Sequence, residues 1–186
     1  MNPAPNLVLV GPMGAGKSSI GKRLAGRFGL SFVDVDHEIE ARTGANIATI
    51  FECEGEAGFR AREAATLADL LAGERQLLAT GGGAVLDPGS RRRMRERGFV
   101  VYLHVSLARQ LERLARDRQR PLIAGADREA VLQRLSEQRA PLYADVADLR
   151  FDTDALFPPQ AAAQLARLLE AQWTRDCHAD FQERTA

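Results

Sequence analysis

Short apolar runs alternate along the chain with longer stretches in which apolar residues recur at helical spacing. Runs of about four to seven residues that are rich in Val, Leu and Phe are typical of strands buried in a sheet. Strands separated by helices favour a mostly parallel sheet with helices on both of its faces. The five predicted strands cover residues 7–10, 31–35, 76–80, 99–105 and 149–152.

Capping signals indicate where the helices between these strands begin and end. Gly29 is placed to end the helix that follows the first strand. Asp87 and Pro88 form an N-cap and first-turn pair, and Ser106 and Asp127 are further N-cap candidates. The predicted helices cover residues 17–28, 36–43, 88–97 and 158–173, and two more begin at residues 107 and 128.

Composition and charge narrow the class of protein. The chain has 186 residues, of which 45% are hydrophobic and 27% charged, so wholesale disorder is excluded and one folded domain is expected. Its 25 Lys and Arg balance its 25 Asp and Glu, whereas a non-specific nucleic-acid binder needs an excess of positive charge. We expect one domain over residues 1–173, a disordered tail over residues 174–186, a monomer, and no nucleic-acid partner.

Targeting signals and cysteines indicate the compartment. No apolar run approaches the roughly 20 residues of a membrane helix, and the start of the chain lacks the basic segment of a signal peptide. Cys53 and Cys177 are too few for a disulfide framework and are expected to be free thiols. We therefore expect a cytoplasmic protein with no membrane partner.

The clearest chemical signal is the segment GPMGAGKS at residues 11–18. It fits the phosphate-loop pattern G-x-x-x-x-G-K-[ST] and lies between a predicted strand and a predicted helix. Glycines let backbone N–H groups turn toward phosphate oxygens, and the positive end of the helix dipole adds to the attraction. Lys17 is placed to reach the β- and γ-phosphates, and the Ser18 hydroxyl is placed to bind Mg²⁺. The segment predicts nucleotide binding.

Two carboxylates end the second predicted strand. Period-two alternation places Asp34 and Asp36 on one face, at the carboxyl edge where ligands bind in open α/β sheets. One is expected to hold metal-bound water, and the other to accept a hydrogen bond or a proton from an acceptor hydroxyl. The simpler alternative is that Asp36 only caps the helix over residues 36–43.

Arginines and glycines mark the expected acceptor side. Arg60 and Glu63 are i,i+3 neighbours on a helix, so Glu63 can orient the guanidinium to capture a carboxylate; the alternative is a surface ion pair. Three glycines at residues 81–83 follow the third predicted strand and let a ligand approach the backbone, unless they form only a flexible turn. Residues 139–143 are expected to end the helix from residue 128, which places Arg139 to face the cleft.

A basic segment over residues 116–126 lies between two predicted helices. It contains Pro121 and Gly125, and such a segment is typical of a lid that closes over phosphates. Arg120 is the candidate for stabilising charge on the transferring group.

Six motifs, in this order along the chain, resemble those of the shikimate kinase family. Members of this family are P-loop kinases that act on a small molecule. The six motifs are the phosphate loop, Asp34-x-Asp36, Phe59-Arg60-x-x-Glu63, Gly81-Gly82-Gly83, Arg120-Pro121-Leu122 and Arg139-x-Pro141-Leu142-Tyr143. The resemblance implies a nucleoside-monophosphate-kinase-like α/β fold in three layers, with a five-stranded parallel sheet and a lid. It also implies transfer of the ATP γ-phosphate to the 3-hydroxyl of shikimate, in aromatic amino-acid biosynthesis.

The same resemblance implies roles for individual residues. The ATP-binding residues would be Gly14, Ala15, Gly16, Lys17, Ser18, Ser19 and, from the lid, Arg120. One Mg²⁺ would be bound by Ser18 and, through water, by Asp34. Shikimate would be held by Asp36, Arg60, Gly82 and Arg139. The catalytic residues would be Lys17, Asp36 and Arg120.

Two alternatives stay open from the sequence. One is another small-molecule kinase on the same scaffold, acting on gluconate or a nucleoside monophosphate, which would not be expected to share the five later motifs. The other is an ATP-binding regulator without catalysis. A GTPase is excluded, because the only lysines are Lys17 and Lys22 and neither follows Asn, as the guanine-reading motif N-K-x-D requires.

Overall fold

Five parallel strands form the centre of the molecule. The computed structural model of the protein describes residues 4–115 and 127–173. The strands are β1 (Asn6–Val10), β2 (Ser31–Asp34), β3 (Gln76–Ala79), β4 (Gly98–His104) and β5 (Leu149–Asp152). They pair in the order β2-β3-β1-β4-β5, so β1 lies in the middle with parallel partners on both sides. The predicted five-stranded parallel sheet is confirmed.

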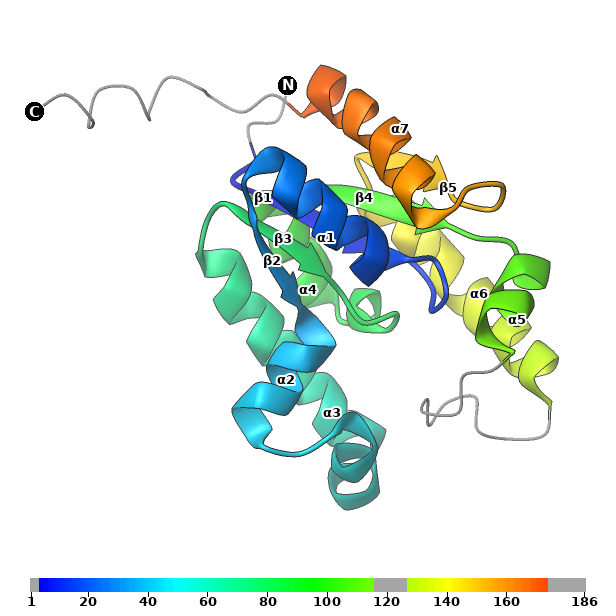
Figure 1. Cartoon of the computed structure of the whole chain (residues 1–186). Helices are drawn as coiled ribbons and strands as arrows, with labels where there is room; N and C mark the ends of the chain where they lie inside the picture. Colours follow the sequence, from blue (N-terminus) through cyan, green and yellow to red (C-terminus); the bar gives the residue numbers. More distant parts are fainter. Residues whose placement is uncertain (1–3, 116–126, 174–186) are drawn as a thin grey trace, which may run out of the picture.

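Helices cover both faces of this sheet (Figure 1). Leu7 and Leu9 of β1 point to the face covered by α1 (Lys17–Phe28) and α7 (Pro158–Gln172). Val8 and Val10 point to the opposite face, where a second core forms. That second face is covered by α2 (Val35–Thr43), α3 (Ile47–Ala72), α4 (Pro88–Arg97) and α6 (Arg128–Val146). The three-layer arrangement therefore follows from the alternation of side chains along each strand.

Short elements at the carboxyl edge of the sheet complete the surroundings of the cleft. A short 3-10 helix, η1 (Ala84–Leu86), follows the three glycines after β3. Helix α5 (Leu107–Leu114) follows β4 and packs beside the phosphate loop, where it forms a small core with Met13. Ser106 caps α5 and Asp127 caps α6, as predicted.

Helix α6 differs from the expectation, and helix α3 has a bend that the sequence pattern does not indicate. Helix α6 contains the whole segment 139–143, including Pro141, and ends three residues later than predicted, at Val146; Tyr143 and Val146 are buried against the sheet. This burial keeps the helix going although proline removes one backbone hydrogen bond. Helix α3 is bent at Gly55, whose φ of 68° lies in the left-handed region that favours glycine.

Several expectations fall on residues that the structure does not describe. The lid over residues 116–126, its Arg120 and the tail over residues 174–186 lie outside the described residues. Within residues 4–115 and 127–173, no helix combines the length and the apolar character of a membrane span.

Candidate active site

The phosphate loop joins the buried strand β1 to the first turn of α1. Gly14 and Gly16 have φ values of 79° and 92°, which glycine adopts without steric cost. Gly16 is the N-cap of α1 and offers no side-chain cap, so the first backbone N–H groups of the helix face the loop. The Nζ of Lys17 donates to the carbonyls of Gly11 and Pro12, at 2.8 and 2.9 Å. This is the arrangement of an anion site built from backbone.

Asp34 connects the loop to the second strand. Its Oδ2 accepts a hydrogen bond from the Ser18 hydroxyl at 2.5 Å, and its Oδ1 accepts one from the backbone N–H of Asp36 at 3.2 Å. Asp34 is therefore the N-cap of α2. A hydroxyl and a carboxylate, both hard oxygen donors, thus meet at the start of α1.

The placement of Asp36 differs from the expectation. The strand predicted over residues 31–35 ends at Asp34, because Asp34 caps a helix that begins at Val35. Asp36 therefore lies in the first turn of α2 and not on a strand face, and it is Asp34 that caps α2. Both carboxylates still line one cleft, although period-two alternation was the wrong reason.

Arg60 is held in one orientation by two glutamates of its own helix. Its Nη1 lies 2.6 Å from Oε2 of Glu63, and its Nη2 lies 3.1 Å from Oε1 of Glu56. The Glu63 side chain is 3% exposed and that of Arg60 is 19% exposed, so the predicted pair is not an exposed surface ion pair. A partly buried, hydrogen-bonded guanidinium of this kind is suited to recognising a carboxylate.

The three glycines after β3 leave room for these charged groups. A Cβ added to Gly83 would collide with the guanidinium of Arg60. A Cβ added to Gly81 would collide with Oε1 of Glu63 and would lie 2.9 Å from Oδ1 of Asp36. At Gly81 and Gly83 a larger residue would have to displace the charged ends of Glu63 and Arg60, whereas a Cβ at Gly82 would make only ordinary contacts. Close packing of side chains therefore favours glycine at two of the three positions.

Arg139 reaches the same place from α6. It is 4% exposed, and its Nη1 would lie 3.6 Å from a Cβ added to Gly82. One turn later, the Tyr143 hydroxyl donates to the carbonyl of Gly82. Among residues 4–115 and 127–173, Arg139 Nε and Glu63 Oε1 are buried atoms without a hydrogen-bond partner. Such atoms are costly in a folded protein unless a ligand satisfies them.

Burial and neighbouring charges shift the pKa values of Glu63, Arg60 and Tyr143. Burial raises the pKa of Glu63, the positive charges of Arg60 and Arg139 oppose that rise, and the nearby Asp36 adds to it. Burial lowers the pKa of Arg60, but Glu63 and Glu56 outweigh burial, so its pKa is raised. Burial also raises the pKa of the Tyr143 phenol. The cluster therefore holds a charged arginine beside a carboxyl group that binds its proton more tightly than usual.

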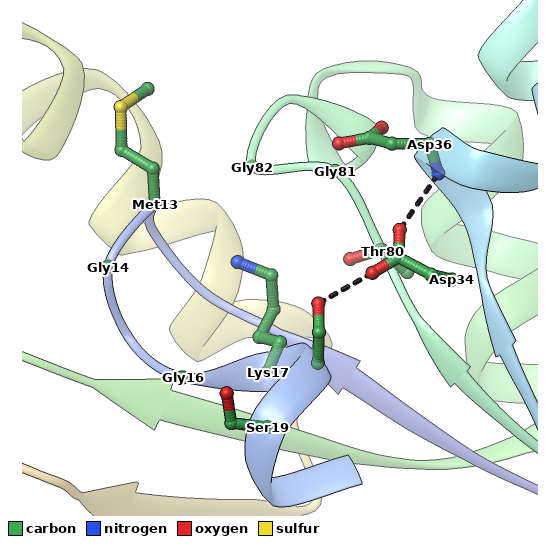
Figure 2. Close-up of a pocket in the computed structure, with 11 residues that line it drawn as sticks. Met13, Gly14, Gly16, Lys17, Ser19, Asp34, Asp36, Thr80, Gly81 and Gly82 are labelled. Atoms are coloured by element: carbon green, nitrogen blue, oxygen red, sulfur yellow. Dashed lines mark hydrogen bonds between the residues drawn. The ribbon is translucent and has the colours of Figure 1, made fainter. Parts of the chain in front are cut away.

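One cleft joins the loop to the acidic and glycine-rich side (Figure 2). Its volume is about 210 Å³, and Lys17 extends into it between the loop and Gly82. The lining residues are Met13, Gly14, Gly16, Lys17, Ser18, Ser19, Asp34, Asp36, Thr80, Gly81 and Gly82. Residues that the sequence places in separate motifs thus face one another across a single space.

Comparison with known proteins identifies the family of this chain. The family model described as "Shikimate kinase" matches residues 13–170. The shikimate kinase of Xanthomonas campestris pv. campestris (strain 8004) is 61% identical over 173 residues, which are 93% of this chain and 96% of that protein. The chain belongs to the shikimate kinase family.

Solved structures of shikimate kinases have the same fold. The enzyme from Acinetobacter baumannii in complex with shikimate is 43% identical, with a TM-score of 0.87 over 90% of this chain and 94% of that one. The enzyme from Aquifex aeolicus is 31% identical, with a TM-score of 0.77 over 91% and 99% of the two chains. Shikimate kinases are ATP-dependent kinases that phosphorylate shikimate, and the predicted family, fold and activity are confirmed for this member.

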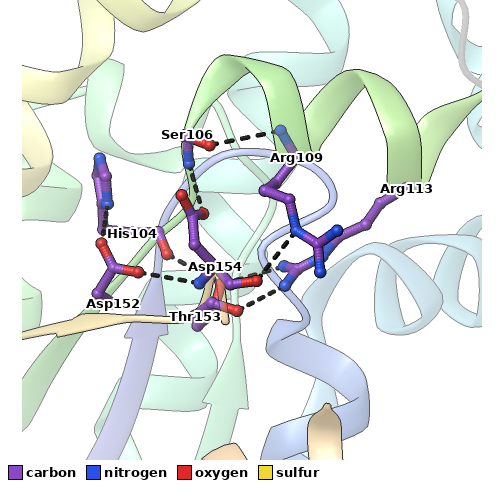
Figure 3. A network of polar contacts seen from close by, with 7 residues as sticks. All are labelled: His104, Ser106, Arg109, Arg113, Asp152, Thr153 and Asp154. Carbon is purple, nitrogen blue, oxygen red and sulfur yellow. Dashed lines mark hydrogen bonds and ion pairs between the residues drawn. The ribbon is translucent and has the colours of Figure 1, made fainter. Parts of the chain in front are cut away.

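A polar network lies on the far side of the phosphate loop (Figure 3). Arg113 of α5 donates to the carbonyl of Gly14 at 3.0 Å and to the carbonyl of Thr153 at 2.6 Å. Arg109 donates to the carbonyl of Asp154, whose side chain accepts from the backbone N–H of Ser106. The network borders a second pocket of about 370 Å³, which lies beside Gly14, Ala15 and Gly16. The exposed side chain of Phe157 also lines this pocket.

Several residues around the site have no predicted role. The spacing of four between Arg139 and Tyr143 indicates that the two lie on one helix face, and this signal can be read from the sequence. Gln110 and Thr153 carry no such signal, because their partners Met13 and Arg113 lie far away in the sequence.

Proposed function

We propose that this shikimate kinase transfers the ATP γ-phosphate to the 3-hydroxyl of shikimate across the cleft between the phosphate loop and the glycines after β3, next to which Arg60 and Arg139 lie. The observation that carries the proposal is that one space is lined by Lys17 and Ser18 on one side and by Asp36 and Gly82 on the other. In-line transfer needs donor and acceptor oxygens held at opposite sides of one phosphorus atom.

In this proposal the loop binds the phosphates of ATP. Backbone N–H groups and the side chains of Lys17, Ser18 and Ser19 surround the phosphates, together with Gly14, Ala15 and Gly16. Lys17 neutralises charge on the β- and γ-phosphates. The pocket on the far side of the loop, beside Arg109, Arg113 and Phe157, has the size and position for the base and ribose.

One Mg²⁺ fits the donor set at the start of α1. The Ser18 hydroxyl would bind it directly and Asp34 through water, and the short contact between these two side chains supports the pairing. When bound, Mg²⁺ neutralises phosphate charge and orients the β- and γ-oxygens. The protein's part is to keep Ser18 and Asp34 together, which the cap on α2 does by holding the Asp34 carboxylate.

Shikimate is held by side chains from three elements. Arg60 and Arg139 bind its carboxylate, and Gly82 lets the ring approach the backbone. Asp36 accepts the hydrogen bond of the 3-hydroxyl and takes its proton. The bond from the 3-oxygen to the γ-phosphorus forms as the bond from phosphorus to the β,γ-bridging oxygen breaks, giving ADP and shikimate 3-phosphate.

Several finer assignments remain part of the proposal. Arg120 would act from a lid over residues 116–126, as the third catalytic residue. A single kinase domain over residues 1–173 followed by a C-terminal tail over residues 174–186, a monomer in the cytoplasm and no nucleic-acid or membrane partner complete it.

The test is the release of ADP from Mg-ATP with shikimate, gluconate or AMP as the acceptor. We expect ADP release with shikimate as the acceptor and none with gluconate or AMP. Phosphorus NMR of the product should show a single phosphate ester, at the 3-position of shikimate. Turnover with gluconate or AMP but not with shikimate would overturn the proposal in favour of another small-molecule kinase. No turnover with any acceptor, together with ATP binding, would indicate a non-catalytic regulator.

A further inference from the structure

Four consecutive carbonyl groups of the phosphate loop are bound by side chains. Lys17, which lies in the cleft, binds the carbonyls of Gly11 and Pro12. The next two carbonyls, of Met13 and Gly14, are bound by Gln110 and Arg113 of α5, at 2.8 and 3.0 Å. The loop is therefore fixed from within the cleft by the lysine that serves the phosphates, and from behind by a helix outside the cleft.

Gln110 lies behind the loop and not in the cleft. It is 4% exposed, and it does not line the space between Lys17 and Asp36. Its side chain packs directly on the loop, since a Cβ added to Gly14 would lie 3.6 Å from Cγ of Gln110. A buried amide that donates to a carbonyl 97 positions away in the sequence is placed to control that carbonyl's direction.

The direction of the Met13 carbonyl determines the direction of the next N–H group. The peptide unit is planar and trans, so the carbonyl of Met13 and the N–H of Gly14 point in opposite directions. Gly14 has a φ of 79° and no side chain, so little in its own conformation prevents this peptide unit from turning over. A hydrogen bond from behind holds the carbonyl away from the cleft and the N–H group toward it.

We infer that Gln110 is a positioning residue for ATP, which holds the Met13–Gly14 peptide unit so that the Gly14 N–H faces the phosphates. The inference rests on the proposed binding of the ATP phosphates by the loop. It goes beyond that proposal by assigning the loop's shape to a side chain that does not touch the nucleotide. The donors to the Met13 and Gly14 carbonyls are Gln110 and Arg113, neither of which is assigned to shikimate. We therefore expect Gln110 to affect the binding of ATP and not that of shikimate.

The experiment measures dissociation constants of Mg-ATP and of shikimate, each alone, by calorimetry on full-length variants. Gln110→Met keeps the size of the side chain and removes its donor. We expect the Kd of ATP to rise about tenfold, the usual scale for a buried carbonyl left without its donor, with the Kd of shikimate unchanged within about twofold. Gln110→Glu places a carboxylate against the carbonyl and should weaken ATP binding further.

Two further variants separate the possible failures. Gln76→Met removes a comparable bond, from Gln76 Nε2 to the Leu70 carbonyl at 2.9 Å, at the other end of the sheet. It should lower the melting temperature and leave both dissociation constants unchanged. Lys17→Met tests the loop itself and should weaken ATP binding strongly.

The inference is overturned if the Gln110 variants bind ATP like wild type while Lys17→Met does not. It is also overturned if Gln110→Met weakens ATP and shikimate binding equally, or if Gln76→Met has the same effect on ATP. Wild-type ATP affinity in Lys17→Met would instead overturn the proposed role of the loop, and the inference with it.

Discussion

The two sides of the cleft are built from different parts of the chain. The donor side is one contiguous loop, residues 11–19, whose backbone N–H groups and helix terminus attract phosphate. The acceptor side is assembled from side chains of α2, α3 and α6 around the glycines after β3. A backbone site is specified by local conformation, whereas a side-chain site depends on how distant elements pack.

The two sides also tolerate change differently. On the acceptor side, Arg60, Asp36 and Arg139 all act on the pKa of Glu63, and a Cβ at Gly81 or Gly83 would collide with a charged side chain. A substitution there disturbs several partners at once. On the donor side, glycines supply conformation, and the loop is held by bonds from Lys17, Gln110 and Arg113.

The largest effect is expected from removing the proposed base, Asp36, which takes the proton of the shikimate 3-hydroxyl. Asp36→Asn keeps the shape of the side chain but removes the base, so we expect kcat to fall by about 10²- to 10⁴-fold. Binding of ATP should not change, because the loop is untouched. Steady-state kinetics with calorimetry measure both, and a melting temperature close to wild type is the control. A wild-type kcat would remove Asp36 from the mechanism.

The next effect tests the tight packing of the acceptor side. In Gly83→Ala the added methyl group displaces the Arg60 guanidinium, so we expect the KM for shikimate to rise about ten- to a hundredfold, the scale of a hydrogen bond to a charged group. The KM for ATP should stay unchanged.

The matched control is a glycine on the donor side of the molecule. Gly26 lies on the exposed surface of α1, and a Cβ added there has nothing within 4 Å. Gly26→Ala should leave both KM values unchanged and raise the free energy of unfolding by about 0.5–1 kcal/mol. Equal kinetic effects of the two substitutions would contradict the difference between the two sides.

The smallest effect concerns the pH dependence of stability. Because burial raises the pKa of Glu63, the folded state binds this proton more tightly than the unfolded chain does. The stabilisation from this group is therefore complete below the unfolded pKa and is lost as pH rises through the folded pKa. The difference in unfolding free energy between wild type and Glu63→Gln should fall over that range. Denaturant unfolding across acidic pH measures it, and a constant difference would contradict the account.

Much of the fold could be predicted from the sequence. The helix over residues 17–28 has the predicted bounds, because the phosphate loop precedes it and Gly29 ends it. The strand over residues 149–152 also has the predicted bounds, because turns flank it. The bounds of α6 could not be predicted, since Pro141 is usually a stop and only the burial of Tyr143 and Val146 carries the helix past it.

The donor side of the site could be predicted from the sequence more completely than the acceptor side. The phosphate loop could be predicted from one contiguous segment. That Gly81 and Gly83 lie against Glu63 and Arg60 could not, because the contact depends on how α3 packs against the segment that follows β3. The interaction of Gln110 with Met13 likewise needs the packing of α5 behind the loop, which no pattern in either segment indicates.

The most direct test of the two-sided cleft is a comparison of two variants, each titrated with ATP and with shikimate. Lys17→Met should weaken ATP binding more than tenfold and leave shikimate binding unchanged. Arg139→Lys replaces a planar fork by a point charge and should weaken shikimate binding by about ten- to a hundredfold, with ATP binding unchanged. Loss of both ligands to the same extent in either variant would contradict the separation of donor and acceptor sides.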